Sequence, residues 1–271
     1  MKSLSLLFTF ALLVGFAACS TSGNGSTGHI EVTLTDAPAD YDSVTVTIEK
    51  VRVHKDIEAE TDSTETDKEA EDDGWVTIMP EPIKINLLEL TNGNRISLGS
   101  KELEAGHYAQ IRFILGSDNT VTVNGETYAL KTPSAQQSGL KLNIDAEVEK
   151  NTTYNLLVDF DATRSIVKKG NGDYSLKPVL HAVNLEATGS ITGNVQPTDF
   201  KTNVLAVTDG DTVSSTLTAD NGDFEIMGLM PNTYNVVFNP GNDQYADSIQ
   251  TDIEVREGEA TDLETVELTS N

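Results

Sequence analysis

The sequence predicts an all-β protein with two antiparallel β-sandwich domains in series, of the Greek-key kind. Three observations lead to this prediction. Apolar and polar residues alternate in many short runs, which is the pattern of a strand with one buried face. Turn sequences such as Asn-Gly at 92–93 and 124–125 separate these runs, as they do in sandwiches. The chain has 271 residues, which is long for one small domain and suits two.

The first domain is predicted over residues 29–187. The parity of its apolar positions changes after Ile48, where Val51 and Val53 follow, so we expect a β-bulge at 49–50. Only residues 86–90 suggest a short helix. The apolar positions of the predicted strands are Ile30/Val32/Leu34, Val44/Val46/Ile48, Ile83/Ile85/Leu87, Ile111/Phe113/Leu115, Val121/Val123, Leu140/Leu142/Ile144, Tyr154/Leu156/Val158/Phe160 and Val179/His181/Val183/Leu185.

A strongly acidic segment interrupts this domain at residues 56–73. It contains ten acidic residues and one basic residue, Lys68, with almost nothing apolar. Such a segment repels itself and stays solvated. We therefore expect an insertion between a strand that ends at Val53 and a strand that begins at Trp75. The alternative is weak binding of divalent cations.

The strand pattern restarts after a boundary near residues 186–190, which predicts a second domain over 188–271 with about seven strands. A local motif recurs across both domains, because Tyr108, Tyr154 and Tyr234 each follow a turn and precede an alternating strand. This is the pattern of a tyrosine corner, in which the phenol binds the backbone across a Greek-key turn.

The N-terminus predicts export. Lys2 precedes an apolar run at 4–16, which is shorter than the roughly 20 residues of a membrane-spanning helix. Residues 1–18 therefore form a predicted signal peptide. Residues 19–28 carry no charge and few apolar groups, and we expect a flexible tether.

The only cysteine of the chain, Cys19, follows Phe16-Ala17-Ala18 in a sequence that resembles a bacterial lipobox. The resemblance implies cleavage after Ala18 and lipid on Cys19. We expect an outer-membrane lipoprotein of the cell envelope. Because no acidic cluster directly follows Cys19, its periplasmic face is favoured over the cell surface.

The net charge excludes one class of partner. The chain has 18 basic and 43 acidic residues, which gives −25. Nucleic acids are bound by concentrated cations, so no nucleic-acid partner is expected. Contact with a membrane is predicted through the lipid on Cys19, not through charge.

No catalytic constellation stands out, so we expect no enzyme, no cofactor and no metal. The chain has no Gly-x-Ser-x-Gly motif and no phosphate loop. His54 and His107 lack the spacing of metal ligands. His181 shares a strand face with apolar residues, and we expect it to be half-buried. Asp159 and Asp161 share the strand face opposite Phe160, and because Arg164 is nearby we expect a salt bridge there; a cation pair or a glycosidase dyad is the alternative.

The candidate ligand-binding residues are Trp75, Gln136, Gln137, Ser138 and Arg164. The polar loop at 132–139 presents the two glutamine amides, which suit sugar hydroxyls or a peptide backbone. An ordinary loop that caps strand ends is the alternative. Trp75 is expected to be a core indole; if exposed, it would stack on a sugar ring.

Two family resemblances follow from longer motifs. In the second domain, Thr218-Ala219-Asp220-Asn221-Gly222-Asp223-Phe224 and Gly228-Leu229-Met230-Pro231-Asn232-Thr233-Tyr234 resemble the carboxypeptidase regulatory-like domain. This resemblance implies a transthyretin-like sandwich, a fold shared with carbohydrate-binding modules.

Residues 29–187 resemble the domain-of-unknown-function family 4382 of bacterial envelope lipoproteins. The matching stretches are Val32-Thr33-Leu34-Thr35-Asp36-Ala37-Pro38, Ala105-Gly106-His107-Tyr108-Ala109-Gln110-Ile111-Arg112, 133–141 and Val158-Asp159-Phe160-Asp161-Ala162. The expected function is non-catalytic binding of a glycan or an envelope protein through loops of the first sandwich. The alternative is a structural or assembly role, in which strand edges pair with partner proteins.

Overall fold

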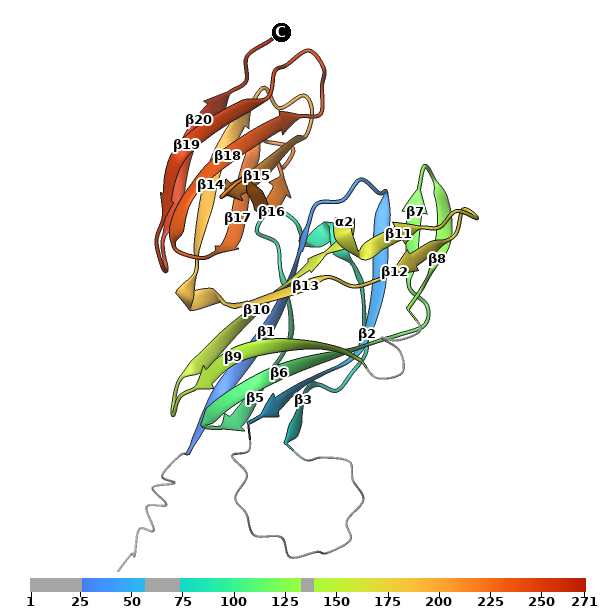
Figure 1. Cartoon of the computed structure of the whole chain (residues 1–271), viewed down its shortest axis with the longest axis vertical. Helices are drawn as coiled ribbons and strands as arrows, with labels where there is room; N and C mark the ends of the chain where they lie inside the picture. Colours follow the sequence, from blue (N-terminus) through green and yellow to red (C-terminus); the bar gives the residue numbers. More distant parts are fainter. Residues whose placement is uncertain (1–25, 57–73, 133–138) are drawn as a thin grey trace, which may run out of the picture.

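The computed structural model describes residues 26–56, 74–132 and 139–271. Their strands form two β-rich domains that follow one another along the chain, with the C-terminal domain at the top of Figure 1. Each domain has two sheets and its own buried hydrophobic cluster. The predicted all-β architecture of two sandwiches is confirmed.

The first domain packs a four-stranded sheet, in the order β13-β10-β1-β5, against a nine-stranded sheet. The order of the large sheet is β11-β12-β8-β7-β2-β6-β9, and β3 and β4 also pair with β2. The elements are β1 (Thr27–Ala37), β2 (Ser43–Lys55), β3 (Trp75–Met79), β4 (Ile83–Asn86), η1 (Leu87–Leu90), β5 (Ile96–Glu104), β6 (Gly106–Leu115), β7 (Thr120–Val123), β8 (Glu126–Lys131), β9 (Leu140–Val148), β10 (Thr153–Asp161), α2 (Ala162–Ser165), β11 (Ile166–Lys168), β12 (Tyr174–Leu176), β13 (Leu180–Asn184) and η2 (Leu185–Ala187).

The second domain contains a three-stranded sheet, in the order β17-β14-β20, and a four-stranded sheet, in the order β16-β15-β18-β19. Its strands are β14 (Gly189–Gln196), β15 (Thr202–Thr208), β16 (Asp211–Leu217), β17 (Asp223–Leu229), β18 (Asn232–Pro240), β19 (Ser248–Val255) and β20 (Ala260–Glu267). Pairing is antiparallel except between β1 and β10, β8 and β12, and β14 and β20, and the sequence pattern did not predict these parallel pairs.

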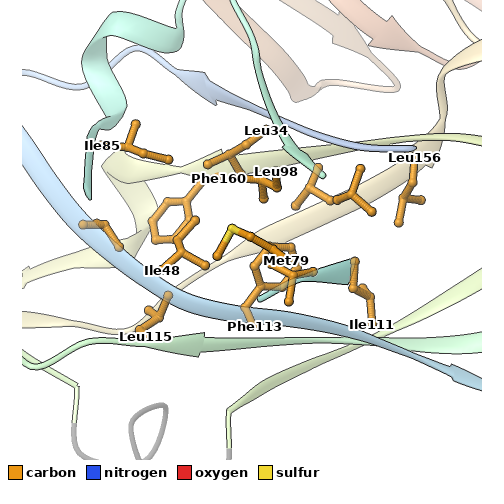
Figure 2. Close-up of a cluster of buried hydrophobic side chains, with 14 of the residues drawn as sticks. Leu34, Ile48, Met79, Ile85, Leu98, Ile111, Phe113, Leu115, Leu156 and Phe160 are labelled. Carbon is orange, nitrogen blue, oxygen red and sulfur yellow. The ribbon is translucent and has the colours of Figure 1, made fainter. Parts of the chain in front are cut away.

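The core of the first domain lies between its two sheets, as Figure 2 shows. Strands β1, β5 and β10 supply one side, and β2 and β6 supply the other. Phe113 and Phe160 are the largest of the labelled side chains, and each is 1% exposed. The residues labelled in the figure are Leu34, Ile48, Met79, Ile85, Leu98, Ile111, Phe113, Leu115, Leu156 and Phe160.

Several local predictions are confirmed. The register of β2 against β6 shifts between Ile48 and Lys50, which is the expected bulge. The expected short helix is η1. Tyr108 and Tyr234 donate their phenol hydroxyls to the carbonyl oxygens of Glu104 and Met230, at 3.0 and 2.7 Å, as tyrosine corners do. Tyr154 differs, because its hydroxyl donates to the carbonyl oxygen of Asp145 on β9, at 3.2 Å.

Other boundaries differ from the prediction. Strand β1 begins at Thr27, inside the segment predicted as a tether, because Ser26 and Thr27 accept backbone hydrogen bonds from Ala105 and Asn151. The sequence did not predict helix α2, because these residues have no helical pattern of apolar positions. The helix begins after Asp161, whose side chain accepts a hydrogen bond from the backbone N–H of Arg164.

One asparagine joins the two domains. The side-chain Oδ1 of Asn92 accepts from the backbone N–H of Glu225 at 2.7 Å, and its Nδ2 donates to the carbonyl of Asp223 at 3.2 Å. The backbone N–H of Asn92 donates to the buried hydroxyl of Thr216 at 2.9 Å. The amide of Asn92 therefore pairs with β17, the edge strand of its sheet, much as a neighbouring strand would.

We expect Asn92→Gly to loosen the junction between the domains. Glycine accepts the positive φ of 58° at this position and keeps the bond to Thr216, but it removes both bonds to β17. A loss of about 1–3 kcal/mol of docking free energy follows from two hydrogen bonds. Faster hydrogen exchange of the Glu225 amide and a larger radius of gyration in small-angle scattering are the expected results.

The matched control for this substitution is Asn124→Gly. Asn124 has a similar φ of 52° and also precedes a glycine, but it lies in the turn between β7 and β8. Asn124→Gly should leave the hydrogen-exchange rate of the Glu225 amide unchanged. Equal effects of the two substitutions would contradict the role assigned to Asn92.

Candidate ligand-binding site

The outer face of the nine-stranded sheet carries an aromatic and cationic surface where β3 begins. Strand β2 lies between β3 and β6, with Trp75 opposite His54 and Arg112 opposite Arg52. Side chains alternate across a strand, so Val53 faces the core and the two neighbours, Arg52 and His54, face outward. We call Arg52, His54, Trp75 and Arg112 the Trp75 platform.

The guanidinium of Arg112 stacks on the indole. Its Cζ lies 4.0 Å from the centroid of the Trp75 ring, and the Cζ of Arg52 lies 5.8 Å from it. The His54 ring is tilted by 60°, with its centroid 4.9 Å from that of the indole. Cation–π contact fixes the guanidinium, and the N–H groups of a stacked guanidinium point outward in its plane.

The platform concentrates positive charge in a strongly acidic chain. Burial lowers the pKa of Arg112 below its ordinary value, and the neighbouring charge of Arg52 lowers it further. The Nε of Arg112 is buried and has no hydrogen-bond partner within the described ranges. No acidic side chain in those ranges forms an ion pair with Arg112.

Trp75 differs from the expectation of a core indole. It is half-buried on the outer face of the sheet. The reason is that Trp75, the first residue of β3, lies opposite His54 of β2, whose side chain faces outward. The role of Trp75 in ligand binding stays a prediction.

The other predicted ligand-binding residues do not join the platform. Gln136, Gln137 and Ser138 lie outside the described residues, and their role stays a prediction. Gly139, which follows them, packs closely on Arg112, since an added Cβ would lie 2.8 Å from the Cγ of that arginine.

Arg164 lies on α2 and belongs to a different cluster. Its Nε is 3.7 Å from Oδ2 of Asp161, which is the expected ion pair. His181 was expected to be half-buried, but it is exposed. The reason is that His181 lies opposite Asp159 on the outer face of the four-stranded sheet, away from the core of the first domain.

The sequence did not single out Arg52 and Arg112. The alternation of β2 and β6 placed both on the polar face, but the register that sets them opposite one another required the structure. Within the described ranges, no group of three or more His, Cys, Asp or Glu side chains is arranged to hold a metal ion. No helix in the described part of the chain has the length and apolar character to cross a membrane.

A family model described as "Domain of unknown function (DUF4382)" matches residues 27–178, more than half of the chain. The chain belongs to the DUF4382 family. The matched region runs from β1 through β12, so the Trp75 platform lies entirely within the DUF4382 domain. A search of curated proteins finds no match to this sequence.

Three solved structures are among those to which the chain is similar. The TIE protein of Bacillus anthracis is 13% identical with a TM-score of 0.23, covering 90% of this chain but only 34% of its own length. The minor pilin of Streptococcus agalactiae is 10% identical with a TM-score of 0.22, covering 89% of this chain and 96% of the pilin. The shaft pilin SpaA of Lactobacillus rhamnosus GG is 11% identical with a TM-score of 0.23, covering 90% and 98%. Because each TM-score is below 0.5, we draw nothing about function from these similarities.

Proposed function

We propose that this DUF4382 protein is a non-catalytic lipoprotein of the bacterial envelope that binds an acidic glycan on the Trp75 platform. The anchor is the lipid predicted on Cys19, and the location is the outer membrane. The observation that carries the binding role is the stacked pair of Arg112 and Trp75, with its centroid distance of 4.0 Å.

The chemistry of the platform favours a sugar that carries a carboxylate. An indole edge or face packs on the apolar C–H surface of a sugar ring, while a guanidinium binds a carboxylate in a bidentate manner. A net charge of −25 disfavours anions elsewhere on the chain, so a local cationic surface confers selectivity. The resemblance of the second domain to carbohydrate-binding folds also supports the proposal.

Matched glycan pairs test the proposal. We expect sialyllactose to bind more tightly than lactose, and polygalacturonate more tightly than its methyl ester. Trp75 is the only tryptophan, so its fluorescence reports binding directly. Arg112→Ala is expected to weaken binding of the acidic member by about tenfold or more, because it removes a charge-assisted hydrogen bond. For Trp75→Ala, calorimetry replaces fluorescence.

Arg256→Ala is the matched control, because it removes the same charge outside the platform. Its side chain is 63% exposed in the second domain. Equal binding of the acidic and neutral glycans, or an Arg112→Ala protein that binds as wild type does, would overturn the proposal. A stable crosslinked complex with another envelope protein, without glycan binding, would favour the assembly role instead.

A further inference from the structure

The first sandwich is open along one side, where each of its sheets ends in an edge strand. Strand β9 is the last strand of the nine-stranded sheet and pairs with β6, and β13 is the last strand of the four-stranded sheet and pairs with β10. Each has one main-chain edge without a neighbouring strand in the part of the chain that the structure describes. Such an edge is a template for pairing with another extended segment.

A groove of about 640 Å³ follows this open side and reaches the core. Its floor includes core side chains from three strands, namely Ile144 of β9, Leu156 of β10 and Ala182 of β13. Met230 of the second domain, which is 55% exposed, also lines the groove. An occupant would therefore contact the hydrophobic core from the side.

The core is less completely covered here than in the middle of the sheet. On β6, the inward side chains of Ile111 and Phe113 are 0% and 1% exposed. The inward apolar side chains of the two edge strands pack on the same core but are only partly buried. They are Leu140 and Leu142 on β9, and Leu180 and Ala182 on β13. A further strand beside β9 would bury more of this apolar surface, which favours association.

The rim of the groove is acidic. Glu147 on β9, Glu149 directly after β9 and Glu186 on η2 line the groove and are exposed. None of these three forms an ion pair with a basic side chain in the described ranges. Asp145 also lines the groove, and its Oδ1 lies 2.8 Å from Nε2 of His107. A positively charged segment complements this rim, whereas a second copy of this chain, with its net charge of −25, is disfavoured.

The alternation of β9 defines the sequence pattern that would fit beside it. Ile144 and Ala146 face the core, and Asp145 and Glu147 face outward. Residues directly opposite one another on paired strands interact, so basic residues of an added strand would lie beside the two acids while the residues between them face the core. The carbonyl of Asp145 accepts from the hydroxyl of Tyr154, which also lines the groove, so this main-chain atom is accessible from the groove.

We propose that the free edge of β9 binds an extended segment of a partner protein, in which apolar residues alternate with lysine or arginine, as an added strand. The main chain of the segment continues the ladder of the nine-stranded sheet. Its apolar side chains enter the groove, and its basic side chains pair with the acidic rim. This site is separate from the Trp75 platform and does not depend on the function proposed for that platform.

A fluorescein-labelled octapeptide of alternating valine and lysine tests the proposal with the whole chain. We expect saturable binding by fluorescence anisotropy, and slower hydrogen exchange of β9 amides when the unlabelled peptide is present. An octapeptide of alternating valine and glutamate reverses the charge. A valine–lysine octapeptide with every backbone nitrogen methylated keeps the side chains but cannot donate to a ladder. Each of these two peptides should bind at least about tenfold more weakly.

Glu147→Lys is expected to weaken binding of the valine–lysine peptide by at least about tenfold, because it places like charges opposite one another. The matched control is Glu267→Lys, which makes the same charge change at an exposed position of β20, also an edge strand of its sheet. Met230→Ala should weaken binding about threefold or more through the lost apolar contact. The absence of peptide binding, equal binding of the methylated peptide, protection of amides outside β9 alone, or equal effects of Glu147→Lys and Glu267→Lys would overturn the proposal.

Discussion

Phe113→Ala should destabilise the first domain by about 3–5 kcal/mol, the range for deleting a buried phenylalanine side chain. Phe113 is 1% exposed and points from β6 into the centre of the cluster in Figure 2. Both sheets surround the site, so it has little freedom to collapse around the lost ring. The truncation therefore costs both the transfer free energy of the ring and the cavity that remains.

Urea denaturation followed by two probes checks this expectation. The only tryptophan, Trp75, belongs to the first domain, so its fluorescence reports that domain alone, while far-ultraviolet circular dichroism reports both domains. Phe113→Ala should move the fluorescence transition to lower urea. The counterpart in the second core is Phe238, which is 0% exposed. Phe238→Ala should move only the later part of the dichroism signal. A fluorescence midpoint that shifts equally in both variants would show that the two cores do not unfold as separate units.

The second large effect is a loss of stability as the pH rises. Burial raises the pKa of Asp36 from its ordinary 3.8 to about 9, and that of Asp159 to about 7. The folded protein therefore holds these protons more tightly than the unfolded chain does. The stability that they contribute is complete below about pH 4, where both states are protonated. It declines through the window up to the folded pKa of each group, by at most about 1.4 kcal/mol per pH unit and group.

A third group acts in the same direction. Hydrogen bonds that the His107 ring donates to Asp56 and Asp145 raise its pKa, so the contribution of His107 to stability is present below its ordinary pKa and is lost as the pH rises through the raised value. The ion pairs of His107 are exposed, so this effect is small.

Comparison of wild type with Asp36→Asn isolates the buried carboxyl group. Asparagine cannot ionise, so the variant should gain stability relative to wild type as the pH rises, by about 2 kcal/mol or more between pH 5 and pH 8. Thermal or urea unfolding at a series of pH values measures the difference. Parallel pH profiles for the two proteins would contradict the shifted ionisation of Asp36.

The local structure of the chain was largely predictable from its sequence, because strand periodicity and turn chemistry act over a few residues. The bulge near Lys50 followed from a change in parity, and the corners at Tyr108 and Tyr234 followed from short motifs. The parallel pairing of β1 with β10 was not predictable, because those strands are more than a hundred residues apart and no local pattern sets their order.

The candidate sites were likewise predictable only in part from the sequence. The sequence alone determined that the chain is all-β, strongly acidic and equipped with a lipobox-like Cys19. It also selected Trp75 as a candidate. Only the tertiary structure brought Arg112 onto that indole, paired Asn92 with β17 and buried Asp36 against the start of α2. Each of these contacts joins residues from different strands or domains, and such contacts depend on sheet order and register, which are fixed by long-range packing.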